Sequence, residues 1–186
     1  PIVHIKGLDK VELKKKDGPY VLQDQETDFK FYRLGWILEG LAEGKLTTDD
    51  GWSLALKWFY SYPPSEIDGW DSYSVSERIS NLSLLYSSHP PKKEIEKKVK
   101  ELLLFQLSFL SRRPEIRGSA TNNHLINNGR ALYLGGLCLG EESFTLLGKA
   151  FLEYGLSEMF YEEGMLREAS SHYQVLLTRT FLEVLY

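Results

Sequence analysis

An all-α fold is what this sequence of 186 residues predicts, and three observations lead to it. From Asp28 onward, apolar residues recur at the helical spacing of three and four positions. Proline and glycine interrupt the chain between these segments, at Pro63-Pro64, at Pro90-Pro91 and at Gly140. After residue 25, no stretch alternates apolar and polar side chains as a half-buried strand would. The pattern therefore predicts about seven helices, joined as successive hairpins.

The N-terminal part is predicted to differ from the rest. Residues 1–27 should form a short extended lead-in, with room for one short strand, because a Gly-Pro pair breaks their mixed pattern. Residues 28–186 should form the helical domain, and its first two helices are expected at 28–42 and 50–62. In the second of these helices, four apolar residues share one face: Trp52, Ala55, Leu56 and Phe59.

The third helix is expected to begin at Ser74-Val-Ser-Glu77. This pattern matches a capping box, in which the Ser and Glu side chains bond free backbone N–H groups. Pro90-Pro91 should end that helix and start a fourth that continues to about Arg113, because proline is tolerated in a first helical turn. Lysines and glutamates alternate along the fourth helix, so its charged face is expected to be solvated surface.

The last three helices are expected at 123–139, at 141–161 and from 171 to the end of the chain. Only a very short link around Gly140 joins the fifth helix to the sixth. This short link predicts that the two helices form an antiparallel hairpin.

Composition excludes several classes of function. A net charge of −4 gives no electrostatic reason to expect nucleic acid as a partner. The longest apolar run, ALYLGGLCLG, is about half of the roughly 20 residues that a membrane-spanning helix needs, so no membrane insertion is expected. The chain starts at Pro1 and stops within an apolar helical pattern, which we interpret as a fragment of a longer protein.

The fifth helix opens with four asparagines, in the run TNNHLINNGR. Steps of four and three from Asn123 place Asn127 and Arg130 on the same face. A polar stripe on an otherwise apolar helix is typical of a cleft wall, and the positive end of the helix dipole favours an anion there. Asn122 is expected to cap the helix, and Asn128, on another face, to be structural. The alternative interpretation is that all four asparagines only cap the helix or bond to neighbouring loops.

A second polar cluster precedes and opens the seventh helix, in the run EEGMLREASSHYQ. Its chemically versatile members are Glu168, Ser170, Ser171, His172 and Tyr173. Only the sixth helix separates the two clusters along the chain. The chain should run away from this end along the fifth helix and return to it along the sixth. The starts of the fifth and seventh helices are therefore expected at the same end of the fold, as at the rim of an α/α barrel.

The two runs GSATNNHLINNGRALYLGGL and EGMLREASSHYQ resemble a known family, as do DFKFYRLGWILEGLA and WDSYSVSERISN. They are similar to the α/α-toroid domain of heparinase II/III-like and alginate-lyase-like polysaccharide lyases, including the bacterial group linked to surface polysaccharides. The resemblance implies an incomplete (α/α) toroid, with further helices and a C-terminal β-sandwich in the parent chain. It also implies a periplasmic or secreted bacterial protein, with no cofactor and no metal ion in this part.

Such lyases cleave acidic polysaccharides that contain uronic acid, for example a glycosaminoglycan or alginate, by β-elimination. The reaction needs donors that neutralise the sugar carboxylate, a base for the C5 proton and an acid for the leaving oxygen. Carried over to this chain, the resemblance makes Asn123 the neutralising residue and His124 an assistant or the base. Tyr173 is then the acid, or the acid and base together. This part alone is expected to be inactive.

The substrate-binding residues expected beside this catalytic set are Arg117, Asn127, Arg130, Glu168, His172 and Trp70. Trp70, in a Gly-Trp-Asp loop, is the expected exposed platform for a sugar ring. The sequence departs from the family pattern at two places: Glu163-Gly164 replaces an Asp-Gly pair, and Ser171 stands where many members have proline.

Two alternatives remain open at this point. A glycoside hydrolase on an α/α barrel would need two carboxylates, drawn from Asp71, Glu77 and Glu168, although Glu77 is already explained as a capping residue. A non-catalytic carbohydrate-binding or scaffold module would use the four tryptophans as stacking platforms. The product separates the enzymes, because only a lyase leaves an unsaturated, ultraviolet-absorbing sugar end.

Overall fold

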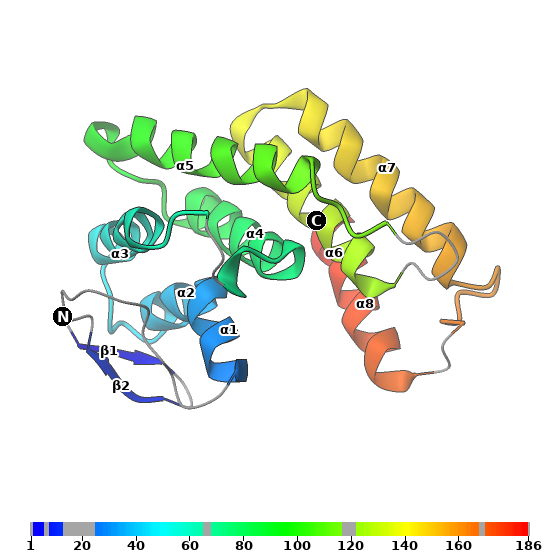
Figure 1. The fold of residues 1–186 in the computed structure, drawn as a ribbon, viewed down its shortest axis with the longest axis horizontal. Helices are drawn as coiled ribbons and strands as arrows, with labels where there is room; N and C mark the ends of the chain where they lie inside the picture. Colours follow the sequence, from blue (N-terminus) through cyan, green and yellow to red (C-terminus); the bar gives the residue numbers. More distant parts are fainter. Residues whose placement is uncertain are drawn as a thin grey trace.

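The computed structural model of the chain describes residues 2–5, 8–12, 25–64, 68–116, 122–167 and 170–185. These residues form eight α-helices, one short 3-10 helix and a pair of short strands, which confirms the all-α prediction (Figure 1). Closure of the helices into a toroid stays a prediction.

The lead-in contains two strands where one was expected. Strand β1 (Ile2–Ile5) pairs antiparallel with β2 (Leu8–Glu12), and the register places Ile2 opposite Glu12 and Val3 opposite Val11. The helical part begins at Gln25, three residues before the predicted start at Asp28.

The predicted first helix is in fact two helices, α1 (Gln25–Arg33) and α2 (Gly35–Ala42), so the expected number of seven was too low. Leu34 separates them with a left-handed backbone, at φ 59°, which is strained for a branched residue. Its side chain is only 1% exposed, so burial offsets the strain. Asn81 Nδ2 also donates to the Arg33 carbonyl at 3.0 Å. These tertiary contacts hold the break, and helical periodicity cannot reveal them.

Side-chain caps begin the next two helices, α3 (Thr48–Ser61) and α4 (Ser72–Ser88). Thr47 and Asp50 form a full capping box at the start of α3. The capping box predicted at Ser74 is wrong, because Asp71 is the N-cap and its Oδ1 accepts a hydrogen bond from the Ser74 N–H at 2.8 Å. Ser74 therefore lies inside α4, and Glu77 takes no part in the cap.

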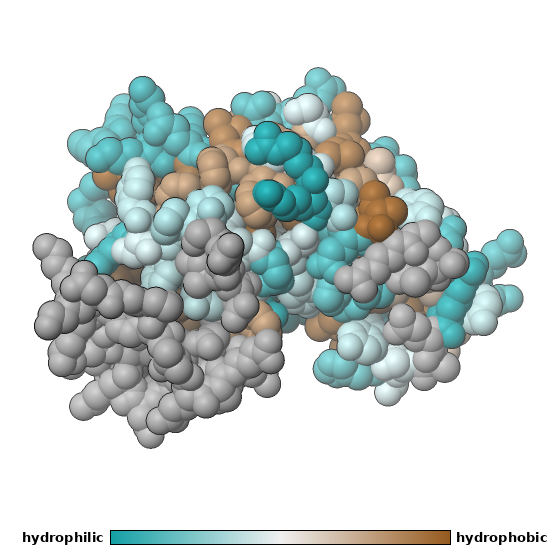
Figure 2. Space-filling view, viewed as in Figure 1, coloured by the Kyte–Doolittle hydropathy of each residue, from teal (hydrophilic) through white to brown (hydrophobic). Residues whose placement is uncertain are grey.

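Helix α5 (Lys93–Ser111) follows the second proline pair, as predicted. Its buried face includes Val99, Leu102 and Gln106. The lysine-rich start of the helix is exposed and forms a hydrophilic surface at the upper left of Figure 2. The predicted solvated face of this helix is confirmed.

Trp70 belongs to an aromatic core enclosed by α1 to α5. It ends the 3-10 helix η1 (Asp68–Trp70) and is 6% exposed. Its indole N–H donates to the Tyr62 carbonyl at 3.0 Å, and its ring packs edge-on against Phe109 at 5.0 Å between centroids. The expected exposed sugar platform is therefore wrong, because η1 turns the indole into the core.

A charged residue, Arg78, completes this core. It is fully buried, and it donates to Gln106 Oε1 at 2.5 Å, to the Tyr32 carbonyl at 2.8 Å and to the Gly69 carbonyl at 2.9 Å. Its guanidinium carbon lies 4.2 Å from the ring centroid of Trp58. One arginine thus ties α1, η1, α4 and α5 together.

Helices α6 (Asn123–Leu139) and α7 (Glu142–Met159) form the predicted antiparallel hairpin. Gly140 caps α6 in the left-handed region, at φ 72°, where glycine carries no steric penalty. Gly148 of α7 lies against the α6 backbone. A β-carbon there would sit 2.3 Å from the Tyr133 backbone nitrogen, so only glycine allows this close approach.

Helix α8 (Ser171–Leu185) packs along α6. Figure 1 shows that α6 and α8 run in the same direction and that α7 runs against them. The two helix starts therefore lie at the same end of the molecule, as predicted. None of the helices in the described part of the chain combines the length and apolar character needed to cross a bilayer.

Candidate functional site

A polar cleft of about 90 Å³ lies where α4, α6 and α8 meet. Asn123, Asn127 and Arg130 form its α6 wall, and Tyr73 and Glu77 form its α4 wall. Helix α8 supplies the remaining wall, which includes Leu177, Arg179 and Thr180. The stripe predicted by helical stepping is therefore the wall of a cleft.

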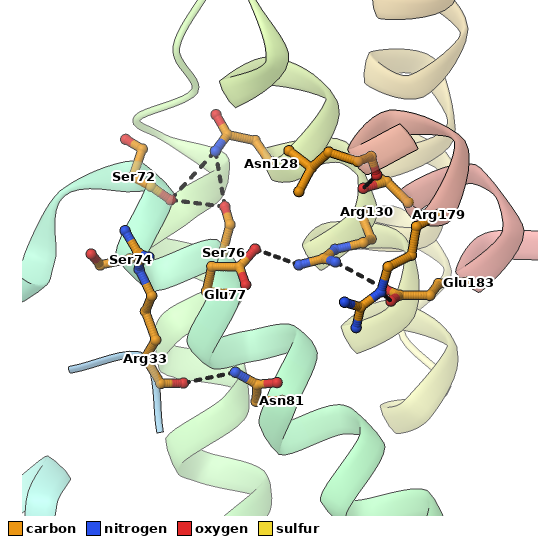
Figure 3. Close-up of polar contacts among 12 residues, drawn as sticks. Arg33, Ser72, Ser74, Ser76, Glu77, Asn81, Asn128, Arg130, Arg179 and Glu183 are labelled. Carbon is orange, nitrogen blue, oxygen red and sulfur yellow. Dashed lines mark hydrogen bonds and ion pairs between the residues drawn. The ribbon is translucent and has the colours of Figure 1, made fainter. Parts of the chain in front are cut away.

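The other two asparagines of the opening run are structural. Asn122 caps α6, with its Oδ1 accepting a hydrogen bond from the His124 N–H at 3.0 Å. Asn128 is fully buried, accepts from the Glu115 N–H at 2.9 Å and donates to Ser76 Oγ at 2.9 Å (Figure 3). Both outcomes match the sequence interpretation, which separated these two from the stripe.

Asn127 is the least satisfied polar side chain of the cleft wall. It is 5% exposed, and its Nδ2 has no hydrogen-bond partner in the described part of the protein. A buried amide donor without a partner costs about 1–3 kcal/mol. A group that costs stability in the wall of a cleft is a candidate for contact with a ligand.

Arg130 joins all three helices that form the cleft. It is 7% exposed and donates to Glu77 of α4 at 2.5 Å and to Glu183 of α8 at 2.8 Å (Figure 3). Arg179 donates to the same Glu183 at 2.8 Å. Two carboxylates thus already balance the charge of Arg130, although its Nε has no partner among the described residues. The predicted role of Arg130 as a substrate ligand stays a prediction.

Tyr73 is a site candidate that the sequence interpretation missed. Its ring lies between the Arg33 guanidinium, 5.0 Å from the ring centroid, and the His124 ring, 4.7 Å between centroids. Burial raises the pKa of Tyr73 above its usual value of 10, the Glu77 carboxylate raises it further, and Arg33 and Arg130 oppose the change. Tyr73 is therefore a neutral phenol at ordinary pH. It stands four residues before Glu77, so helical stepping along α4 would have found the pair.

His124 contacts the ring of Tyr73 and is not among the described residues that line the cleft. Its Nδ1 is 2.9 Å from Glu115 Oε2, a contact that fixes the orientation of the imidazole. Glu115 was also missed, because it lies before α6 in a segment without helical periodicity. The pair places an oriented imidazole against the phenol of the cleft wall.

Tyr173 and His172 lie in the first turn of α8, at the end of the molecule where the cleft is found. Tyr173 is 38% exposed, and its ring contacts that of His172 at 5.6 Å between centroids. Its charge is the smallest of the causes that affect the pKa of Tyr73, and it acts to raise it. Tyr173 is not among the described residues that line the cleft, whose α8 wall begins at Leu176. Two further predicted ligands, Arg117 and Glu168, lie outside the described residues.

Within the described ranges, no group of three or more His, Cys, Asp or Glu side chains is arranged to hold a metal ion. Comparisons of the chain with protein-family models, with curated proteins and with solved structures gave no match. The functional conclusion therefore depends on the geometry of the cleft and on the motifs of the sequence.

Proposed function

We propose that this chain is part of a polysaccharide lyase, and that its β-elimination site is the cleft between α4, α6 and α8. The observation that carries the proposal is that two amide side chains and a neutral phenol line one cleft: Asn123, Asn127 and Tyr73. Neutral donors suit the carboxylate and the enolate-like dianion that develops from it. A protonated phenol suits the leaving oxygen.

In the proposed reaction, a base removes the C5 proton and the electrons form the C4–C5 double bond. The bond from C4 to the glycosidic oxygen breaks, and that oxygen takes a proton from a phenol. Asn123 neutralises the carboxylate, as the resemblance implies. As the resemblance implies, the base is His124, which Glu115 orients, or Tyr173; it accepts the C5 proton and passes it to solvent, and the phenol that protonates the leaving oxygen regains its proton from solvent.

Two tyrosines can supply the proton for the leaving oxygen. The resemblance assigns this role to Tyr173, and the structure adds Tyr73 as a candidate. The position of Tyr73 in the cleft wall favours Tyr73, because Tyr173 is not among the described residues that line the cleft. The surrounding helices would continue into an α/α toroid in the parent protein.

The experiment is to incubate the complete gene product with heparan-type and alginate-type polysaccharides and to follow ultraviolet absorbance and product mass. We expect an absorbing product whose mass is one water lighter than that of a hydrolysis product. Asn123→Ala and Tyr73→Phe should abolish most turnover. Lys97→Ala on the solvated face of α5 should leave it unchanged. Failure to cleave any uronate polymer would contradict the lyase proposal.

A glycoside hydrolase is the second candidate, because Glu77 is not a capping residue and lies in the cleft. It is less well supported, since Arg130 engages both Glu77 and Glu183. A saturated product with a new reducing end would favour it.

A sugar-binding module that stacks its ligand on tryptophan has less support. All four tryptophans of the chain are buried: Trp36, Trp52, Trp58 and Trp70.

A further inference from the structure

The strongest unassigned feature of the cleft is its pair of unsatisfied donors. Asn127 Nδ2 and Arg130 Nε are both buried without a partner among the described residues, and they lie one helical turn apart on α6. In the described part of the cleft wall, the side-chain atoms that are buried and unpartnered are all donors. The wall therefore requires acceptor atoms from a ligand and does not require further donors.

The amide of Asn127 is able to face the ligand. No hydrogen bond joins it to another described residue, so rotation of the amide exchanges Nδ2 and Oδ1 without breaking a contact. By contrast, Asn128 is held at both of its amide atoms. Of the two buried asparagines of α6, Asn127 is thus the one whose amide is able to turn toward the cleft.

The electrostatic surroundings favour an anion in this position. Asn123 is the first residue of α6, so the cleft lies at the positive end of that helix dipole. Three arginines, Arg33, Arg130 and Arg179, lie in or beside the cleft, against Glu77 in its wall and Glu183 beyond Arg130. Glu115 approaches the same ring of Tyr73 through His124, so the charged side chains around the cleft nearly balance, and the helix dipole supplies the preference for an anion.

We infer that Asn127 is the anchor for the carboxylate of a hexuronate residue, with the Nε edge of Arg130 as the second donor and Asn123 nearer the reacting sugar. A carboxylate offers two acceptor oxygens and no donor, which is what the two unsatisfied groups require. This inference rests on the proposed function and deepens it. It assigns the discrimination between charged and uncharged sugars to Asn127.

The test is calorimetric titration of the chain with short hexuronate oligosaccharides, from heparosan and from alginate, each paired with its carboxyl-reduced counterpart. We expect one or both of the charged oligosaccharides to bind, and the reduced sugars to bind roughly tenfold more weakly or not at all. Asn127→Ala should remove this preference, and so should the isosteric Asn127→Asp, which places a negative charge in the wall. Lys149→Ala, an exposed change on α7, should bind as the unaltered chain does.

Folding does not confound the result, because Asn127 bonds to no described residue and circular dichroism will report whether each variant keeps its helices. Equal binding of charged and reduced sugars, unchanged binding by Asn127→Ala, or no binding at all would overturn the inference. Preferential binding without cleavage by the complete gene product would retain this inference and refute the lyase. If the Asn127→Ala variant cleaves the polymer with unchanged kcat/KM, the lyase proposal is retained and this inference is refuted.

Discussion

Arg78 and Arg130 are both buried, yet two regions of the molecule use them in different ways. Arg78 lies in the aromatic core of α1 to α5 and donates to neutral oxygens alone. Arg130 lies in the wall of the cleft and donates to two carboxylates. The core thus contains a cation that its own groups stabilise, whereas the cleft contains a cation within a polar network that a ligand can reach.

The two environments have different physical consequences. Burial lowers the pKa of Arg78 from its usual value to about 9, so the residue stays charged at neutral pH. Its Nη2 has no hydrogen-bond partner among the described residues, and the indole faces of Trp58 and Trp70 stabilise the cation instead. Arg130 has no comparable aromatic contact in the described structure, and it depends on Glu77 and Glu183. Substitution of Arg78 should therefore affect the fold, and substitution of Arg130 should affect the cleft.

Removal of Arg78 should have the largest effect. Arg78→Ala leaves a cavity and three acceptors without their donor, on Gln106, Tyr32 and Gly69. We expect the free energy of unfolding, measured in urea, to fall by about 3–5 kcal/mol. Arg112→Ala, at an exposed position, is the control, with an expected change within about 0.5 kcal/mol. A loss below about 1 kcal/mol for Arg78→Ala would refute the claim that its hydrogen bonds hold α1, η1, α4 and α5 together.

Removal of Arg130 should have the next largest effect. Arg130→Met leaves two carboxylates facing each other, and we expect a loss of about 2–3 kcal/mol in the free energy of unfolding. This is less than for a fully buried pair, because Glu77 and Glu183 keep 25% and 32% of their side-chain exposure. Glu77→Gln added to Arg130→Met should restore part of the loss. If the double variant loses as much free energy of unfolding as the two single variants together, or more, then Glu77 is not the carboxylate that Arg130 stabilises.

Asn127 and Asn128 allow a structural residue and a cleft residue to be compared within one helix, α6. Asn128→Ala should reduce the free energy of unfolding by about 1–3 kcal/mol, because it leaves the Glu115 N–H and Ser76 Oγ without their partner. Asn127→Ala should leave it unchanged or raise it by up to about 1 kcal/mol, since it removes a donor whose unpaired burial itself costs stability. Thermal unfolding followed by circular dichroism measures both. The reverse order would show that Asn127 supports the fold.

Tyr73 should give the smallest effect, which depends on pH. Its pKa is raised in the folded protein, so the folded state holds the proton more tightly than the unfolded state does. Tyr73 therefore contributes stability that is present below its unfolded value of 10 and is lost as the pH rises through the folded value. Tyr73→Phe should lose less stability between pH about 9 and about 11 than the unaltered chain. Tyr60→Phe, at an exposed ring, should follow the unaltered chain, and equal slopes for both variants would contradict the assignment.

Periodicity predicted the elements whose structure depends on local sequence. Helix α6 begins and ends at the predicted residues, and stepping along it gave the stripe of Asn123, Asn127 and Arg130. The break at Leu34 was not predictable in this way, because Asn81 and the burial of Leu34 hold it from outside the segment.

The errors at Trp70 and Ser74 have a common physical cause. A Gly-Trp-Asp segment has the composition of an exposed turn, but a hydrogen bond to Tyr62 holds the indole inside. A Ser-x-x-Glu pattern has the spacing of a capping box, but Asp71, three residues earlier, caps the helix first. In both cases a hydrogen bond to a nearby residue, Tyr62 or Asp71, determines where the side chain lies or where the helix begins.

The partners of the site were beyond the reach of sequence patterns for a related reason. Arg130 lies 53 positions from each of its carboxylates, Glu77 and Glu183, so no local spacing connects them. Tyr73 meets Arg33 and His124 from two other helices. The stripe predicted the α6 wall of the cleft. The other walls are formed by α4 and α8, whose packing against α6 cannot be deduced from local spacing.

Chemical-shift mapping by NMR tests the contrast between core and cleft most directly. The ¹⁵N-labelled chain is titrated with the hexuronate oligosaccharide that binds, and side-chain amide, indole and guanidinium signals are followed together. We expect shifts at the Asn123 and Asn127 amides, and none at the Trp70 indole or the Arg78 Nε–H in the core. Shifts confined to the core signals, or an unchanged Asn127 amide at saturation, would contradict the claim that this cleft is the sugar-binding site.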